Sequence, residues 1–129
     1  MVALHQISGA TDGIVVGTGN KVEDFGVGFY TKYGDGGIDI SPIADLMKSE
    51  VWDMGKKLGI LQEIIDAPPT DGLWEDGRTD SDQLDGLTYQ QMEEAMENPN
   101  SKYFGQYTKI RKPNLHKMNP IPIFKKQKD

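Results

Sequence analysis

The sequence contains no cysteine and only two histidines, His5 and His116. Without cysteine the chain has no disulfide framework, no thiolate metal site and no cysteine nucleophile. Two histidines alone support neither a nucleophilic triad nor a zinc centre, since such sites draw on several histidine, cysteine or acidic partners. A chain without cysteine fits a reducing compartment, so we expect a cytoplasmic protein.

Long apolar runs are also missing from the 129 residues. No stretch approaches the ~20 apolar residues of a membrane-spanning helix, and the N-terminus lacks a basic region followed by an apolar one. We therefore expect a soluble protein that does not contact membranes. The length suffices for one domain with a single hydrophobic core.

Charge is distributed unevenly along the chain. Residues 1–100 carry 6 basic and 19 acidic side chains, a balance of -13, whereas residues 101–129 carry 8 basic and 1 acidic, a balance of +7. The basic segment is either a solvated tail or a segment that folds over an anionic ligand. Nucleic-acid binding is not expected, because the acidic body would repel a phosphate backbone.

The run from Val15 to Lys48 combines lysines and carboxylates with seven glycines. The apolar segment 13–17 predicts a buried strand of an α/β sheet, followed at once by the turn 18–20. Glycine permits close approach of the backbone to a ligand, and lysine beside exposed N–H groups suits phosphate. Ligands of open α/β sheets lie beyond the carboxyl ends of strands, so the sequence predicts a nucleotide site here.

Three helices are predicted further along. Ser41 and Pro42 form a helix-start signal, and the apolar spacing that follows predicts a helix with one buried face, ended by Gly59. Thr88 and Gln91 form a capping box for a helix to about Glu97. We expect a short helix after residue 101, with extended segments created by the prolines beyond it: Pro113, Pro120 and Pro122.

Residues 67–86 are rich in proline, glycine and aspartate and predict a long loop of the kind that serves as a lid. We expect Leu73 and Trp74 to pack this loop onto the body of the protein.

Several polar residues have both a structural and a functional reading. A carboxylate after the 18–20 turn fits Mg²⁺, which prefers one or two carboxylates with phosphate oxygens and water, but paired acidic residues also form ordinary solvated faces. The flanks of the 31–37 turn offer a phosphate donor and a sugar-hydroxyl acceptor, or simply a turn. These readings concern Glu23, Lys32, Asp39, Lys48, His116 and Lys117.

The motifs together resemble the C-terminal half of ammonia-dependent NAD synthetases over about residues 13–124. The segments that carry the resemblance are Gly17–Asn20 with Glu23, Thr31–Gly37 with Asp39, Pro42–Lys48, Pro69–Trp74, and His116–Lys117 before a proline. The resemblance implies an α/β fold, a partial Rossmann-like layer of the adenine-nucleotide-hydrolase type with one or two parallel strands followed mostly by helices and loops. Residues 1–12 are left unassigned.

The resemblance also implies the chemistry. These enzymes activate the nicotinate carboxylate of deamido-NAD with ATP as an adenylate, and ammonia then displaces AMP to give NAD. By resemblance Thr18, Lys48 and Thr70 contact ATP, and Glu23 binds Mg²⁺. Lys32, Asp39, His116 and Lys117 are expected to contact deamido-NAD. The family resemblance further implies a homodimer.

One departure from the family is large. Family members carry an upstream Ser-Gly-Gly-x-Asp-Ser loop that cradles pyrophosphate, and this sequence has no room for it before residue 17. We therefore expect an incomplete active site that needs an N-terminal half. The alternatives are a non-catalytic nucleotide-binding or interaction module, or another amide-forming or adenylating member of the wider ATP-pyrophosphatase group.

Overall fold

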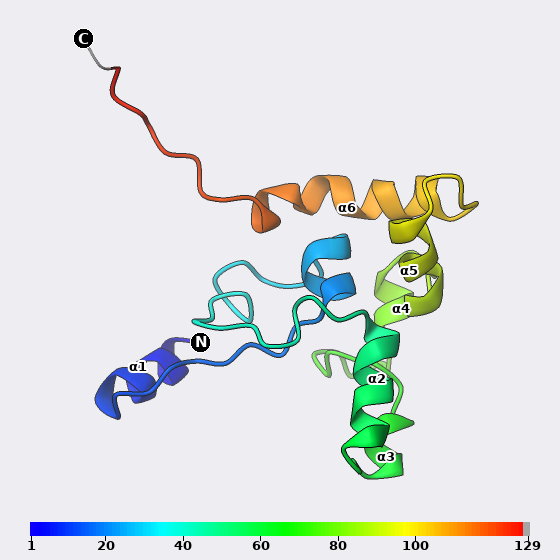
Figure 1. The fold of residues 1–129 in the computed structure, drawn as a ribbon, viewed down its shortest axis with the longest axis horizontal. Coiled ribbons are helices and arrows are strands. Elements are labelled where there is room, and N and C mark those ends of the chain that lie inside the picture. The colour runs from blue at the N-terminus through cyan, green and yellow to red at the C-terminus, as the bar shows by residue number, and fades with distance from the viewer. Residues whose placement is uncertain (128–129) are drawn as a thin grey trace.

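The computed structural model describes residues 1–127 and shows a mostly helical chain within that range (Figure 1). Its elements are α1 (Val2–Ala10), the π-helical segment η1 (Val22–Val27), α2 (Lys48–Lys57), α3 (Gln62–Ile65), α4 (Asp80–Gln83), α5 (Tyr89–Glu97) and α6 (Phe104–Met118). No helix in this part of the chain is long and apolar enough to cross a membrane.

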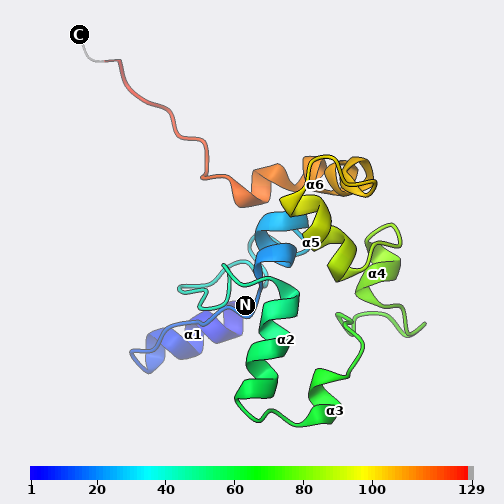
Figure 2. The same ribbon diagram turned by 45° about the vertical axis from the view of Figure 1, so that its right-hand side comes forward.

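The hydrophobic core lies where η1, α5 and α6 meet, with η1 beneath α6 in both ribbon views (Figures 1 and 2). Polar side chains of α6 reinforce this packing. The hydroxyl of Tyr107 donates to the carbonyl of Gly26 at 3.2 Å, and Asn114 Nδ2 donates to that of Val27 at 3.0 Å. The buried apolar residues of this core are Val22, Val27, Leu84, Leu87, Tyr89, Met92, Ala95 and Tyr107.

The predicted strand over 13–17 is reduced to a single parallel bridge between Val16 and Ile40. Two backbone bonds frame it: Gly17 N–H to Ile40 at 2.8 Å and Asp39 N–H to Val15 at 2.9 Å. The prediction of one or two parallel strands is therefore wrong for the described residues, although the pairing is parallel. A strand needs further ladder partners, and none of residues 1–127 supplies them, which leaves Val16 52% exposed.

The helix predicted with Ser41 as its N-cap and Pro42 as its first residue begins six residues later, at Lys48. Residues 41–46 form turns instead, because the carbonyl of Leu46 accepts from Lys21 N–H at 2.8 Å and joins this segment to the 17–21 turn. The start of α2 is capped from inside the helix, where Glu50 Oε2 accepts from Met47 N–H at 2.7 Å.

The end of α2 agrees with the sequence, but its burial does not. Gly59 adopts a left-handed φ of 73° just after the helix, as glycine beyond a helix end commonly does. No residue of α2 is fully buried, and Leu58 is 72% exposed. The main packing partners of α2 among the described elements are α3 and α5, and they do not cover the predicted apolar face.

The last two helices differ in how well the sequence predicted them. The predicted capping box of α5 is present, with Thr88 Oγ1 accepting from Gln91 N–H at 3.3 Å and Gln91 Oε1 accepting from Thr88 N–H at 3.0 Å. α6 is longer than predicted, and Pro113 lies inside it rather than ending it. Packing on η1 outweighs the backbone bond that the proline removes.

α1 lies apart from the core in both views and has no buried residue (Figure 2). A hydrogen bond joins α1 to the turn at residues 31–37, where His5 Nε2 lies 2.7 Å from the carbonyl oxygen of Gly37. The apolar residues of α1 are therefore exposed, with Val2 at 86% and Ile7 at 60%.

Candidate functional site

Glu23 lies in the first turn of η1, shortly after the turn at residues 18–20. Asn20, only 2% exposed, accepts with Oδ1 from the N–H groups of Val22 at 3.0 Å and Glu23 at 3.1 Å. This side chain satisfies two amides at the start of η1 that have no helical partner. Glu23 is thereby fixed at the base of the turn, while Thr18 is exposed on it.

Glu23 and Lys48 form an ion pair between η1 and the first residue of α2. Lys48 Nζ lies 2.8 Å from Glu23 Oε1, and the two side chains are 19% and 17% exposed. Burial acts to raise the pKa of Glu23, but the hydrogen bond and charge of Lys48, together with a hydrogen bond from Tyr89, lower that pKa below its usual value. Glu23 is thus a carboxylate in the folded protein, with a cation beside it.

Two further residues complete what we call the Glu23 cluster: Glu23, Lys48, Asp80 and Tyr89. The Tyr89 hydroxyl lies 2.7 Å from Glu23 Oε1 and 2.7 Å from Asp80 Oδ2. Burial, followed by the two carboxylates, raises the pKa of Tyr89, so the phenol stays protonated and acts as a donor. Lys48 Nζ also lies 4.8 Å from the centre of the Tyr89 ring.

Asp24 occupies the space beside Gly19. A Cβ added at Gly19 would lie 2.2 Å from both carboxylate oxygens of Asp24, so any larger residue would displace this side chain. Burial, with the negative charges of Glu23 and Asp35, raises the pKa of Asp24 to about 6. A side chain at position 19 would therefore be accommodated only by moving the Asp24 carboxylate away from the turn.

The four residues expected to contact deamido-NAD lie around the end of α6. Lys32 Nζ donates to the carbonyl of His116 at 2.7 Å, and Lys117 Nζ donates to the carbonyls of Gly28 at 2.8 Å and Tyr30 at 2.7 Å. Asp39 Oδ2 accepts from Val15 N–H at 2.7 Å. Both lysines thus have backbone partners in this structure, which a bound anion would have to replace or share.

Two hollows adjoin this region. One of about 300 Å³ is bordered by Asp24, Tyr30, Asp39, Ser41 and Lys117 among others. The other, about 620 Å³, lies between Tyr30, Asn114 and Lys117 on one side and Asp71 and Leu73 of the loop on the other. Asp39 and Lys117, predicted to share a ligand, therefore border the same hollow.

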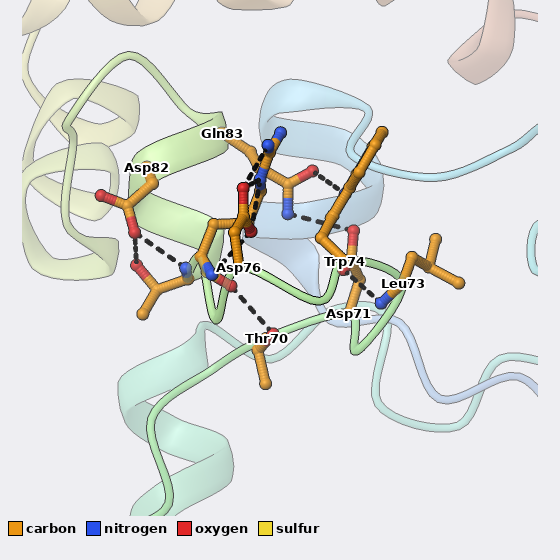
Figure 3. Close-up of polar contacts among 9 residues, drawn as sticks. Thr70, Asp71, Leu73, Trp74, Asp76, Asp82 and Gln83 are labelled. Atoms are coloured by element: carbon orange, nitrogen blue, oxygen red, sulfur yellow. Dashed lines mark hydrogen bonds and ion pairs between the residues drawn. The ribbon is translucent and has the colours of Figure 1, made fainter.

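The loop 67–79 is held by its own polar contacts (Figure 3). Thr70 Oγ1 donates to the carbonyl of Arg78 at 3.1 Å, and Asp71 Oδ1 accepts from Leu73 N–H at 3.0 Å. The expectation that Leu73 and Trp74 pack down is wrong, since they are 79% and 51% exposed. Trp74 is instead held at the surface, with its Nε1 donating to Gln83 Oε1 at 3.3 Å and Arg78 stacked 4.3 Å from its ring.

The structure thus places the eight predicted residues in three sets. Glu23 and Lys48 are in contact, the residues around α6 form a second set, and Thr18 and Thr70 are exposed on separate turns. Sequence reasoning missed Asp80 and Tyr89. Asp80 lies among many loop aspartates and Tyr89 follows a helix cap, so spacing alone offered no signal that they meet Glu23.

Solved structures place this fold among synthetases. The structure matches the NMN synthetase of Francisella tularensis with a TM-score of 0.85 at 32% identity, over 95% of this chain and 51% of that one. It matches the ammonia-dependent NAD synthetase of Campylobacter jejuni with a TM-score of 0.65 over 97% of this chain and 51% of that one; at 24% identity this likeness concerns the fold.

Sequence comparison gives the family. The NAD synthase family model matches residues 1–120, and this chain belongs to the NAD synthase family. The ammonia-dependent NAD synthetase of Methanococcoides burtonii is 50% identical over 65% of this chain, and that of Thermoplasma acidophilum 40% identical over 92%. The chain spans 31% and 46% of these two relatives, so it corresponds to less than half of each.

Proposed function

We propose that this chain forms one wall of the active site of an ammonia-dependent NAD synthetase. The observation that carries the proposal is the contact between Glu23 and Lys48, the predicted metal ligand and the predicted ATP contact, at 2.8 Å beside the Gly17–Asn20 turn. The reaction is ATP-dependent ligation of ammonia to deamido-NAD. The chain's relatives with that printed activity are about twice its length, so the other side of the active site has to come from a part that these 129 residues do not include.

The proposed reaction has two steps. The nicotinate carboxylate of deamido-NAD attacks the α-phosphorus of ATP, and pyrophosphate leaves. Ammonia then attacks the activated carbonyl carbon, AMP leaves with the former carboxylate oxygen, and the nitrogen loses a proton to give the amide. The protein's part is positioning and charge neutralisation, so well-placed cations and hydroxyls suffice on this wall.

The residues of this chain divide the task. Lys48 neutralises phosphate charge, with Thr18 and Thr70 as hydroxyl partners of ATP. Lys117 and Asp39 border one hollow and bind the deamido-NAD moiety together with Lys32 and His116. Binding there replaces the contacts that the lysines now make with backbone carbonyls.

Mg²⁺ fits the chain at one ligand position. Both hydrogen bonds from Lys48 and Tyr89 reach Oε1 of Glu23, whereas Oε2 has only the long 3.5 Å contact with Asn20 N–H. A single carboxylate with phosphate oxygens and water is a usual Mg²⁺ environment. When bound, Mg²⁺ would neutralise phosphate charge; no cluster of three acidic or histidine ligands exists among residues 1–127.

A complementation experiment tests the proposal. The chain is mixed with the N-terminal half of the Thermoplasma acidophilum relative, and NAD and pyrophosphate are measured with ATP, deamido-NAD and ammonia. We expect product only from the mixture. Activity of the isolated chain would refute its incompleteness, and a folded but inactive complex would oppose the assignment.

A non-catalytic nucleotide-binding module is the main alternative. Calorimetry with deamido-NAD separates the two: binding that Lys32→Ala abolishes, without any reconstituted turnover, favours the module. Lys57→Ala, on the exposed end of α2, is the matched control and should leave binding unchanged.

The likeness to an NMN synthetase at a TM-score of 0.85 supports a second product, NMN, formed from the corresponding mononucleotide. Comparing both acceptors in the complemented mixture would decide between them. We also expect self-association, since apolar side chains such as Val2 and Ile7 are exposed, and a cytoplasmic setting remains the prediction from composition.

A further inference from the structure

Asp80 is a buried carboxylate with no assigned part in the reaction proposed above. It is 7% exposed and is the first residue of α4. Its Oδ2 contacts the Tyr89 hydroxyl at 2.7 Å, while Oδ1 is buried without a hydrogen-bond partner among residues 1–127. Burying a carboxylate costs free energy, so a fold that needed only packing here would place an apolar residue.

Tyr89 connects Asp80 to Glu23. Its hydroxyl lies 2.7 Å from Glu23 Oε1, and its ring packs edge-on against Trp52 at 6.1 Å between centroids. Oε1 of Glu23 therefore lies within hydrogen-bond distance of two donor groups, Lys48 and Tyr89, and Glu23 and Asp80 share the single hydroxyl proton of Tyr89. The positions of the two donor groups orient the carboxylate so that Oε2 remains the oxygen with unused acceptor capacity.

Asp80 also anchors the loop that carries Thr70. Its backbone N–H donates to the carbonyl of Pro69 at 3.0 Å and closes the base of residues 70–79. One residue thus holds the loop through its backbone and reaches the partner of Glu23 through its side chain. A shift of the loop base would be transmitted to the Glu23 carboxylate through Tyr89.

We propose that Asp80 and Tyr89 are positioning residues that hold Glu23 in the orientation of a divalent-cation ligand and tie it to the loop bearing Thr70. The proposal rests on the proposed function only for the identity of the cation. Hydrogen bonds from neighbouring side chains orient a metal-binding carboxylate, and their loss lowers metal affinity about tenfold or more.

The first test measures the side-chain motion of Glu23 by ¹³C relaxation in the full chain without metal. Tyr89→Phe and Asp80→Asn should each increase that motion, with the larger effect in Tyr89→Phe. Tyr107→Phe is the matched control, because it removes a buried hydroxyl bonded to Gly26 and leaves Glu23 untouched. Unchanged Glu23 motion in Tyr89→Phe would overturn the proposal whether or not metal binds.

The second test measures the affinity of the same variants for Mn²⁺ alone. We expect Tyr89→Phe to weaken binding about tenfold, Asp80→Asn to weaken it less, and Tyr107→Phe to leave it unchanged. The free energy of unfolding of each variant is measured in urea beside its affinity. A loss of affinity that only followed a loss of stability would refute positioning.

The two tests separate this inference from the proposed function. If the wild-type chain binds no Mn²⁺, the metal role of Glu23 in the proposed function fails, and the relaxation experiment still decides whether Asp80 and Tyr89 hold the carboxylate. If Glu23 gains motion but Mn²⁺ affinity does not change, the orientation has no bearing on the cation and the proposal is wrong on that point.

Discussion

Lys48 Nζ lies 2.8 Å from Glu23 Oε1, so the proposed phosphate-binding cation and the proposed metal-binding carboxylate are each other's counterions in the ligand-free chain. The pair is mostly buried, with 19% and 17% of the side chains exposed. Mg²⁺ and ATP would supply a new opposite charge to each member. We therefore expect Mg²⁺ at Oε2 of Glu23 and ATP at Lys48 to compete with this ion pair rather than to fill unpaired charges.

Lys48→Met should destabilise the chain at neutral pH. The substitution leaves Glu23 largely buried without its cation. Because the pair is neither fully exposed nor fully buried, we expect the free energy of unfolding to fall by about 2 kcal/mol. Urea unfolding followed by tryptophan fluorescence measures it. Lys56→Met removes an exposed pair with Asp53, with side chains 56% and 67% exposed, and should change stability little; an equal loss would contradict the reasoning.

The same pair predicts a pH dependence. Burial opposes the lowered pKa of Glu23, and Lys48 and Tyr89 outweigh it, so the folded pKa lies below the ordinary 4.5. The stabilisation is complete above the unfolded pKa and is lost as the pH falls through the folded value. Unfolding between pH 3 and 7 should show this loss in the wild type and not in Lys48→Met.

Asp24 should act in the opposite direction. Its folded pKa of about 6 exceeds the ordinary 3.8 because of burial and the charges of Glu23 and Asp35, so stability falls as the pH rises from about 4 to 6. Asp24→Asn removes the charge and should stabilise the chain by about 1 kcal/mol at pH 8, after allowance for solvent screening. At pH 4 the gain should vanish. Asp53→Asn, 67% exposed, is the control.

Gly28→Ala should disturb the end of α6. Gly28 has a φ of 68°, and an added Cβ would lie 2.7 Å from Cβ of Asn114 and 2.9 Å from Cε of Met118. We expect a loss of 1–3 kcal/mol, about the cost of such backbone strain, and weaker deamido-NAD binding, because Lys117 is held by the Gly28 carbonyl. In the control Gly105→Ala nothing lies within 4 Å, and alanine should stabilise α6.

Thr88→Ala tests the cap of α5. The hydroxyl accepts from Gln91 N–H at 3.3 Å, and losing such a cap costs about 1 kcal/mol. Thr108→Ala, on an exposed position of α6, should be neutral or slightly stabilising because alanine has the higher helix propensity. The free energy of unfolding in urea compares the two, and equal effects would show that the cap does not hold α5.

Local signals were reliable where the structure depends on neighbours in sequence. The α5 capping box and the glycine after α2 were predicted because their partners lie within a few residues. The start of α2 was misplaced because the carbonyl of Leu46 pairs with Lys21, a partner that no local pattern reveals. The helix continues through Pro113 for the same kind of reason, since packing on η1 is a distant contact.

The sequence by itself determined the family, through motifs in a fixed order. It also supplied candidate residues for binding phosphate, a metal ion and a dinucleotide. Only the tertiary structure decided that Glu23 and Lys48 neutralise each other, that the Tyr89 hydroxyl joins Asp80 to Glu23, and that the lysines predicted to contact the substrate donate to backbone carbonyls near α6. The physical reason is that charge pairing and burial depend on distances between segments far apart in the chain. Spacing along a sequence does not encode those distances.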